Sequence, residues 1–226
     1  MPEAIYDFHT HTFLSDGELS PVELIRRAAV RGYRVIGLTD HAGPGNAAFI
    51  VRQLVRDCAF CEKYWDIRCL PGVELTHVPA AGIDEIARLA RAAGARIVVV
   101  HGETPVEPVE PGTNLAAIRS AYVDVLGHPG LITEEEAQIA AANGTFLELS
   151  ARGGHSLTNG HVARIALAAG ARLLVNSDTH SPRDILTSEL ARRVALGAGL
   201  DATMADLVLQ SHPEQLLARL ESLFDR

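Results

Sequence analysis

The sequence has little lysine, little cysteine and no long apolar run, and each shortage excludes a class of protein. No stretch reaches the roughly eighteen consecutive apolar residues of a membrane-spanning helix, and the N-terminus shows no basic segment followed by an apolar run. We therefore expect a cytoplasmic protein with no membrane partner. Cys58 and Cys61 lie one helical turn apart and Cys69 is nearby, but three thiols are too few for a four-ligand zinc site, so buried, inert thiols are expected.

The charge balance argues against a nucleic-acid-binding surface. The formal net charge is −8, and Lys63 is the only lysine among the basic residues. Proteins that neutralise phosphates over a broad surface need an excess of positive charge, so a long nucleic acid is not expected as a partner. The 47% hydrophobic and 21% charged residues are typical of a globular protein with a large core. A small-molecule substrate is favoured instead.

Short apolar runs alternate with alanine- and leucine-rich segments of helical period, which is typical of parallel strands joined by helical crossovers. No linker rich in proline, glycine or serine divides the chain. We therefore predict an α/β fold, a (β/α)7 barrel that forms one domain over residues 1–226, with eight units as the neighbouring alternative. The predicted strands span residues 4–9, 34–40, 67–75, 95–101, 123–128, 145–150 and 172–178.

Several predicted helices have recognisable ends. Residues 20–32 place Ser20 at the N-cap, Pro21 at the first helical position and Gly32 after the end, as helix capping prefers. Residues 133–144 and 181–197 are predicted to repeat this scheme. The proline-rich, acidic segment 103–114 directly follows a strand and is predicted as a loop over the site.

Histidines and carboxylates stand at the ends of six of the predicted strands. In a parallel α/β barrel the active site lies at the C-terminal ends of the strands, where the loops converge. His9 and His11 are two residues apart, as are Asp178 and His180, so each pair can face the same side. The sequence therefore predicts a metal site at this rim. The strand-end candidates are His9, His11, Asp40, His41, Glu74, His101, His128, Asp178 and His180.

The chemistry of these candidates limits the metal. Imidazole nitrogens and carboxylate oxygens, with no cysteine among them, suit zinc, manganese or iron better than copper(I) or an iron–sulfur cluster. A single ion of ordinary coordination number would use fewer residues than the rim offers. We therefore expect a cluster of two or three divalent ions as the cofactor.

The ordered segments HTHT, SDG, LTDH, GVEL, VVVHGE, LGHPG and NSDTH resemble the successive motifs of the PHP family, the polymerase and histidinol phosphatase superfamily. The likeness runs from about residue 5 to about residue 185. Within the family the chain is most similar to the small stand-alone histidinol-phosphatase-type proteins. The resemblance implies a distorted TIM-like barrel of seven strands with a trinuclear metal site.

The resemblance also implies how the ligands are shared. One ion would be held by His9, His11, Glu74 and Asp178. Glu74 would bridge to a second ion held also by His101 and His128, and the third would be held by Asp16, His41 and His180. Some family members have histidine where this chain has Asp16, and the change keeps a ligand but makes the cluster more anionic. Asp40 would either orient a ligand or play a structural part.

The expected activity is that of a metal-dependent phosphatase, which hydrolyses small phosphomonoesters by metal-activated water. Histidinol phosphate is the leading substrate. Glu74, Asp178 and His180 are the expected catalytic residues, with His180, His77 or His155 as the candidate proton donor to the leaving alkoxide. The candidate substrate-binding residues are Arg152, Arg183 and His155, because a guanidinium can donate two hydrogen bonds to a phosphate.

Three other interpretations remain open at this point. Metal-dependent amidohydrolases also begin with an H-x-H pair, but those with two bridged ions usually use a strand-end lysine, whereas Lys63 is expected inside a helical segment. A phosphodiesterase or nucleotide phosphatase could use the same scaffold, because fold and cluster do not fix the substrate. A non-catalytic binding module is the third, although degenerate sites lose ligands and every expected ligand is present here.

Overall fold

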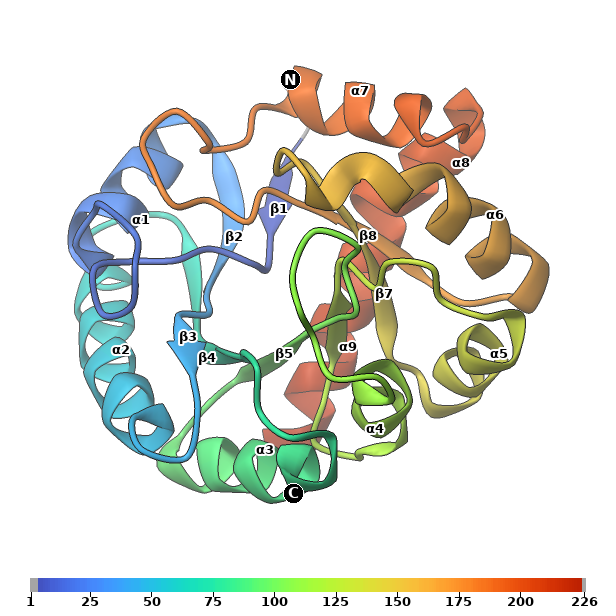
Figure 1. The fold of residues 1–226 in the computed structure, drawn as a ribbon. Coiled ribbons are helices and arrows are strands. Elements are labelled where there is room, and N and C mark those ends of the chain that lie inside the picture. Colours follow the sequence, from blue (N-terminus) through green and yellow to red (C-terminus); the bar gives the residue numbers. More distant parts are fainter. Residues whose placement is uncertain (1–3, 225–226) are drawn as a thin grey trace.

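Seven parallel strands line the centre of the molecule in the computed structural model, which describes residues 4–224 (Figure 1). They are hydrogen-bonded in the order β1-β2-β4-β5-β6-β7-β8 and form a nearly closed barrel, which confirms the predicted fold class. A two-residue strand, β3 (His41–Ala42), pairs with β4 and was not predicted. The strands are β1 (Ile5–Asp7), β2 (Tyr33–Leu38), β4 (Arg68–Leu75), β5 (Ile97–His101), β6 (Val125–Gly127), β7 (Phe146–Ser150) and β8 (Leu173–Asn176).

The first and last strands meet just beyond their ends. The amide of Asp178 donates to the carbonyl of His9 at 2.9 Å, and the amide of His11 donates to the carbonyl of Thr179 at 2.8 Å. Thr10 and Thr179 form an isolated parallel bridge. The segment that follows β1 is thus fixed against the segment that follows β8, and these two segments carry five of the predicted ligands.

Helices surround the barrel (Figure 1). The predicted domain limits include residues 1–3 and 225–226, which lie outside the described residues. Three shorter helical turns are η1 (Ala80–Gly82), η2 (His155–Thr158) and η3 (Leu207–Ser211). The α-helices are α1 (Pro21–Val30), α2 (Ala47–Cys61), α3 (Ile83–Ala93), α4 (Thr113–Arg119), α5 (Glu134–Asn143), α6 (Asn159–Ala169), α7 (Ser188–Gly197), α8 (Ala202–Asp206) and α9 (His212–Phe224).

Two of the three predicted helix starts are as expected. The Ser20 side chain accepts a hydrogen bond from the Glu23 amide at the start of α1. Thr133 and Glu136 form a reciprocal capping box at the start of α5.

The predicted helix over residues 181–197 is wrong in its first part. The carboxylate of Asp184 accepts hydrogen bonds from the amides of His180 and Ser181, which fixes a turn instead. The helix α7 begins only at Ser188, where Thr187 caps it. Arg183 therefore lies in an exposed turn rather than at a helix start.

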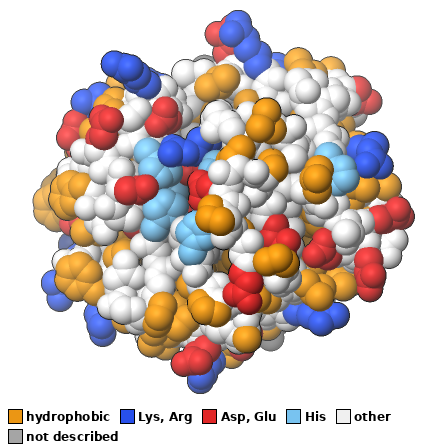
Figure 2. All heavy atoms as spheres, in the orientation of Figure 1, with side chains coloured by type: hydrophobic (Ala, Val, Ile, Leu, Met, Phe, Trp, Pro, Cys, Tyr) orange, Lys and Arg blue, Asp and Glu red, His pale blue; other side chains and the backbone are white. Residues whose placement is uncertain are grey.

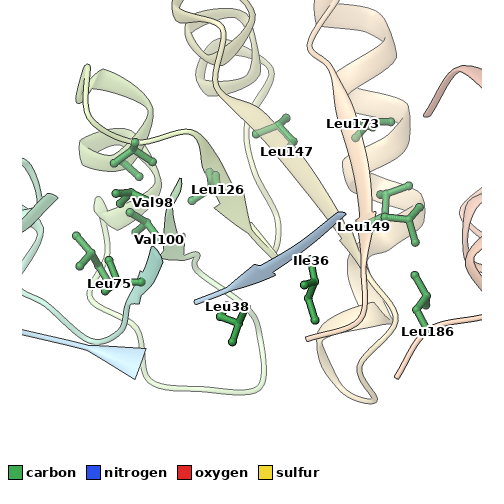
Figure 3. Close-up of a cluster of buried hydrophobic side chains, with 14 of the residues drawn as sticks. Ile36, Leu38, Leu75, Val98, Val100, Leu126, Leu147, Leu149, Leu173 and Leu186 are labelled. Atoms are coloured by element: carbon green, nitrogen blue, oxygen red, sulfur yellow. The ribbon is translucent and has the colours of Figure 1, made fainter. Parts of the chain in front are cut away.

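Apolar side chains on opposite faces of the strands form two separate clusters. Side chains that point outward, such as Val98, Val100 and Leu126, pack between the sheet and the helices (Figure 3). Side chains that point inward, such as Ile97 and Val99, fill the barrel. This alternation follows from the two-residue period of a strand.

The inward-facing positions change from apolar to polar along the strands. On β5 the inward series Ile97 and Val99 ends in His101, and on β7 Phe146 is followed two residues later by Glu148. The interior therefore has an apolar floor and a polar upper layer at the C-terminal ends. The floor is completed by α9, whose Leu216, Leu217 and Leu220 belong to the same inner cluster.

Among residues 4–224 no helix combines the length and the apolar character that a membrane crossing needs.

The closure of the floor by α9 predicts a loss of stability when one of its contacts is removed. Leu216 is fully buried, so Leu216→Ala should lower the free energy of unfolding by about 2–5 kcal/mol through lost burial and the cavity left behind. Leu223→Ala, at a 44% exposed position of the same helix, should change it by no more than about 0.5 kcal/mol. Urea unfolding followed by circular dichroism measures both, and equal effects would contradict the packing described here.

Candidate metal centre

Histidines and carboxylates from distant parts of the chain meet at the C-terminal ends of the strands. Figure 2 shows the histidines gathered in a hollow near the middle of this face, with acidic and basic side chains beside them. The nine residues that the resemblance singled out all belong to this gathering. Six of them are at most 2% exposed, namely His9, His11, Glu74, His101, His128 and Asp178.

The innermost group joins the two histidines after β1 to carboxylates from β4 and from the segment after β8. His9 Nε2 lies 3.2 Å from an oxygen of Glu74 and 4.0 Å from an oxygen of Asp178. His11 Nε2 lies 3.2 Å from the same Asp178 oxygen and 3.8 Å from the other Glu74 oxygen. Two imidazoles and two carboxylates thus converge on one small volume.

Glu74 also reaches two further histidines. Its Oε1 lies 3.3 Å from His128 Nε2, and its Oε2 lies 2.6 Å from His41 Nδ1. His101 is next to His128, with ring centroids 4.4 Å apart. The position of Glu74 between these groups suits the bridging part that the resemblance assigns to it.

The third group lies nearer the surface. His41 Nε2 and His180 Nε2 lie 3.4 Å and 3.3 Å from the same oxygen of Asp16. The donor atoms of His11, Asp16, His41 and His180 all lie within 4.8 Å of one another. The Asp16 side chain is 56% exposed, so this group is open to solvent.

Several donor atoms of the innermost group, among them His9 Nε2, His11 Nε2 and Glu74 Oε1, are buried without a hydrogen-bond partner. Glu148 pairs with His9 Nδ1 at 2.7 Å, and because a carboxylate can only accept, His9 donates there and its Nε2 keeps a lone pair. That lone pair faces Glu74 Oε1 at 3.2 Å, and both atoms are buried without a partner. His11 Nε2 is buried and unpartnered as well. Buried acceptors that face each other need a proton or a cation between them, so the group fits a metal ion.

The pKa shifts of His9 and Asp178 also indicate that positive charge would stabilise the innermost group. Although burial opposes it, the carboxylates of Glu148, Glu74 and Asp178 raise the pKa of His9 well above its ordinary value. Burial, with the nearby charges of Glu74 and Glu148, raises the pKa of Asp178 to about 7. Bound cations would stabilise the charged form of Asp178 and the neutral form of His9.

Glu148 is a functional residue that the sequence reasoning missed. It lies inside β7, the strand without an expected ligand, and is fully buried. Besides its contact with His9, it accepts a hydrogen bond from the Asn176 side chain at 2.9 Å. The sequence did contain a signal for it, because a carboxylate at an inward-facing position of a buried strand needs a polar or charged partner. Its contact with Nδ1 fixes the orientation of the His9 ring, as the partners of metal-binding histidines do.

Asp40 positions a loop and makes no hydrogen bond to a ligand histidine among the described residues. Its carboxylate accepts from the Thr12 amide at 2.7 Å, from the Thr12 hydroxyl at 2.8 Å and from the Ser15 hydroxyl at 2.7 Å. These bonds fix the segment between His11 and Asp16. The structural alternative for Asp40 is therefore the one that the contacts favour.

Backbone strain is concentrated at the rim. His128 and Asp178 have φ angles of +25° and +54°, in the left-handed region that residues other than glycine seldom adopt. Such strain persists where the surroundings fix it, and it often accompanies function. His128 directly follows β6 and Asp178 is the second residue after β8, and both carry their side chains into the inner group.

The three candidate substrate-binding residues have different positions. Arg152 lies at the site, with Nη1 2.7 Å from His180 Nδ1 and Nε 3.8 Å from an oxygen of Asp178. His155 stacks on His128 with ring centroids 4.1 Å apart, and burial, followed by the charges of nearby histidines, lowers its pKa to about 3. Arg183 is exposed, and within residues 4–224 its one side-chain-mediated hydrogen bond runs from its backbone amide to Ser181 rather than to the cluster.

The three cysteines are free and buried, as expected, and lie away from the histidines. A hydrogen bond that the Cys58 thiol donates to Cys69, together with burial, raises the pKa of Cys58 well above its ordinary value. Burial raises the pKa of Cys61 to about 11. A cavity of about 720 Å³ beside Cys58 and Cys69 is lined by residues at the start of β4, the end of the barrel that usually serves stability.

A model of the PHP domain matches residues 7–170 of the sequence. The chain belongs to the PHP family. It is 47% identical over 216 residues to an uncharacterized protein from Methanocaldococcus jannaschii, covering 95% of this chain and 99% of that protein. It is 30% identical over 203 residues to a protein named as a probable phosphatase from Caldanaerobacter subterraneus, covering 80% of this chain and 78% of that one.

Two solved structures show a similar fold at low sequence identity. A histidinol phosphate phosphatase from Lactococcus lactis, complexed with zinc, L-histidinol and phosphate, superposes with a TM-score of 0.59 at 16% identity, over 87% of this chain and 94% of that one. A chain of an archaeal ribonuclease P bound to mature tRNA superposes with a TM-score of 0.71 at 14% identity, over 98% and 93%. Both likenesses concern the fold.

The contact between Glu148 and His9 predicts a measurable effect on metal binding. Glu148→Gln keeps the shape of the side chain but removes the charge that holds the Nδ1 proton of His9. The affinity for zinc should fall about 10- to 100-fold. Competition with a chromogenic chelator measures this, and Glu135→Gln, at an exposed position of α5, is the matched control. Equal affinities in the two variants would contradict the orienting role.

Proposed function

We propose that the chain is a metal-dependent phosphoesterase that hydrolyses small phosphomonoesters, with histidinol phosphate as the leading substrate. The observation that carries this proposal is the buried group of facing nitrogen and oxygen acceptors without partners. Membership of the PHP family and relatives named as probable phosphatases support it. The fold likeness to the Lactococcus lactis enzyme complexed with L-histidinol and phosphate supports the choice of substrate.

The proposed cofactor is a cluster of two or three divalent ions, zinc, manganese or iron. The donor set of imidazoles and carboxylates suits these metals. Such ions supply an activated water and neutralise phosphoryl oxygens. We propose that the whole chain, residues 1–226, works as one domain around this cluster. The proposed ligands are His9, His11, Asp16, His41, Glu74, His101, His128, Asp178 and His180, with Glu74, Asp178 and His180 nearest to the chemistry.

The residues of the chain have separate tasks in this proposal. Arg152 and the carbonyl of Asp178, 2.9 Å away, compete for Nδ1 of His180. If His180 uses Nε2 as a ligand, Nδ1 donates to that carbonyl, as in most metal-bound histidines. Arg152 is then free to donate two hydrogen bonds to phosphate oxygens. His155, with Nε2 3.8 Å from an oxygen of Asp178, is the proposed substrate-binding histidine. Because its lowered pKa leaves it neutral near pH 7, it would donate a hydrogen bond to the substrate rather than a proton.

The amidohydrolase interpretation finds no support in the positions of the residues. Lys63, expected inside a helical segment, lies in an exposed turn just after α2 and away from the rim. The place between the groups is taken by the carboxylate of Glu74. A phosphomonoesterase therefore explains the donor set without a lysine bridge.

Phosphate release tests the proposed activity. We expect protein loaded separately with zinc, manganese or iron to hydrolyse histidinol phosphate faster than a nucleoside monophosphate or p-nitrophenyl phosphate. Glu74→Ala should abolish the activity, because Glu74 contacts a histidine from each of the three proposed ion sites, namely His9, His128 and His41. Activity on p-nitrophenyl phosphate alone would contradict the choice of histidinol phosphate as the substrate. Activity on phosphodiesters alone would contradict the proposed hydrolysis of phosphomonoesters.

The two arginine candidates make a matched pair. Arg152→Lys keeps the charge but loses the planar fork, so kcat/KM for phosphomonoesters should fall about 10- to 100-fold. Arg183→Lys should leave kcat/KM within about twofold, because Arg183 is exposed in a turn. Steady-state kinetics on the same substrate compare them, and a larger loss at Arg183 would reverse the assignment.

A further inference from the structure

A carboxylate from the loop after β5 reaches the histidine cluster from above. Residues 102–112 connect β5 to α4 and cross the mouth of the barrel (Figure 1). Glu107 Oε2 lies 3.1 Å from His101 Nε2 and 3.3 Å from His77 Nε2. Its Oε1 lies 3.5 Å from His155 Nε2. Neither Glu107 nor His77 belongs to the nine proposed ligands.

The other acidic residues of this loop serve its structure. Glu103 Oε1 accepts from the amides of Gly112 and Asn114, both at 2.9 Å, and so closes the base of the loop. Glu110 accepts from the amide of Ala80 at 3.1 Å, on the connection that carries His77. Glu107 is thus left to face the histidines, and the two connections that supply it and His77 are tied together.

Close packing also fixes the base of the loop. Gly130 has a φ of +64°, and a Cβ placed on it would lie 1.8 Å from the carbonyl oxygen of Glu103. Asn114 accepts from the Glu103 amide at 3.0 Å and donates to the carbonyl of Pro129 at 2.8 Å. Thr104 lies 2.8 Å from His155 Nδ1. These contacts hold the loop in the conformation that directs Glu107 inward.

The donor atoms have the geometry of a cation site. The ligand atoms of His77, His101 and Glu107 lie within 4.8 Å of one another. His101 Nδ1 lies 3.2 Å from the carbonyl of Gly102 and donates to it, which leaves Nε2 with its lone pair toward Glu107. His77 has a φ of +51°, a strained conformation for a histidine that turns its ring toward the cluster. Two imidazoles and one carboxylate are a familiar ligand set for zinc.

We propose that His77, His101 and Glu107 bind a divalent cation at the mouth of the barrel, and that this cation fastens the 102–112 loop over the site. The proposal rests on the proposed function, because the cation is the ion already assigned there to Glu74, His101 and His128. Nδ1 of His101 donates to the carbonyl of Gly102, so the ring offers only Nε2 and can serve only this one ion. Glu107 is a ligand from a loop, whereas the other ligands lie at or near strand ends. Binding of the cation would therefore also hold the 102–112 loop in place over the site.

The test compares Glu107→Gln with Glu110→Gln. Both changes remove one negative charge from the same loop, but the side-chain amide introduced by Glu110→Gln retains an acceptor oxygen for the Ala80 amide. The full chain is stripped with a chelator and titrated with zinc, and bound zinc is measured by calorimetry and by elemental analysis. Hydrogen–deuterium exchange of peptides that cover residues 102–112 is followed at each zinc level.

We expect zinc to slow exchange in the 102–112 loop of the unchanged protein and of Glu110→Gln. In Glu107→Gln this protection should disappear, and about one zinc site per chain should weaken roughly 10-fold or more. The proposal is overturned if Glu107→Gln keeps either the same zinc binding or the same zinc-dependent protection. His77→Gln should reproduce the loss, and its failure to do so would remove His77 from the site.

Phosphate release by the same samples separates this inference from the proposed function. The protein could be inactive on every phosphate ester and still show zinc-dependent protection of the 102–112 loop that requires Glu107. This result would support the cation site and contradict the phosphatase activity. Hydrolysis of phosphate esters with loop protection independent of Glu107 would support the phosphatase and reject the cation site.

Discussion

The site depends on the contact between the buried carboxylate of Glu74 and the imidazoles around it, where hydrogen-bond acceptors lie close together without enough donors. Its carboxylate is fully buried and faces nitrogen atoms of His9 and His128 at 3.2–3.3 Å. When His9 is neutral, its proton lies on Nδ1 toward Glu148, so its Nε2 and the Glu74 oxygen that it faces are both acceptors. Burial of such acceptors costs free energy unless positive charge lies between them. The proposed cations would therefore link the stability of this layer to its chemistry.

The barrel separates stability from function along the direction of the strands. Below the cluster, the inward-facing positions are apolar and α9 closes the floor with leucines. Above it, the same inward positions become histidine or carboxylate, and the loops set their final orientation. Strain at His128 and Asp178 lies at this boundary, just beyond the ends of β6 and β8. The packed floor and the paired ends of β1 and β8 can hold these residues against their backbone preference.

Much of this arrangement could be predicted from the sequence because it follows from local period and from barrel topology. Strand ends carry His9, His101 and Asp178 to one rim whatever the loops do. Only the predicted start of the helix over residues 181–197 was wrong, because Asp184 accepts hydrogen bonds from the amides of His180 and Ser181 and so competes with a helix there. Such competition between side chain and backbone has no periodic signal.

Other features depend on contacts between distant segments. Glu148 was missed because its function comes from His9, 139 residues away. Glu107 could be placed in a loop over the site, but its contacts with three histidines depend on how the bases of two connections pack. The position of Arg152 beside His180 likewise follows from the conformation of the loop after β7. Loop conformation, which the sequence pattern does not specify, therefore determined most of what could not be predicted.

The most direct test of the central claim is a crystal structure of zinc-loaded protein with anomalous difference maps on either side of the zinc absorption edge. The account predicts strong zinc peaks between His9, His11, Glu74 and Asp178, and between Glu74, His101 and His128. Maps without zinc peaks at these buried residues, in crystals that show zinc bound elsewhere on the surface, would contradict it.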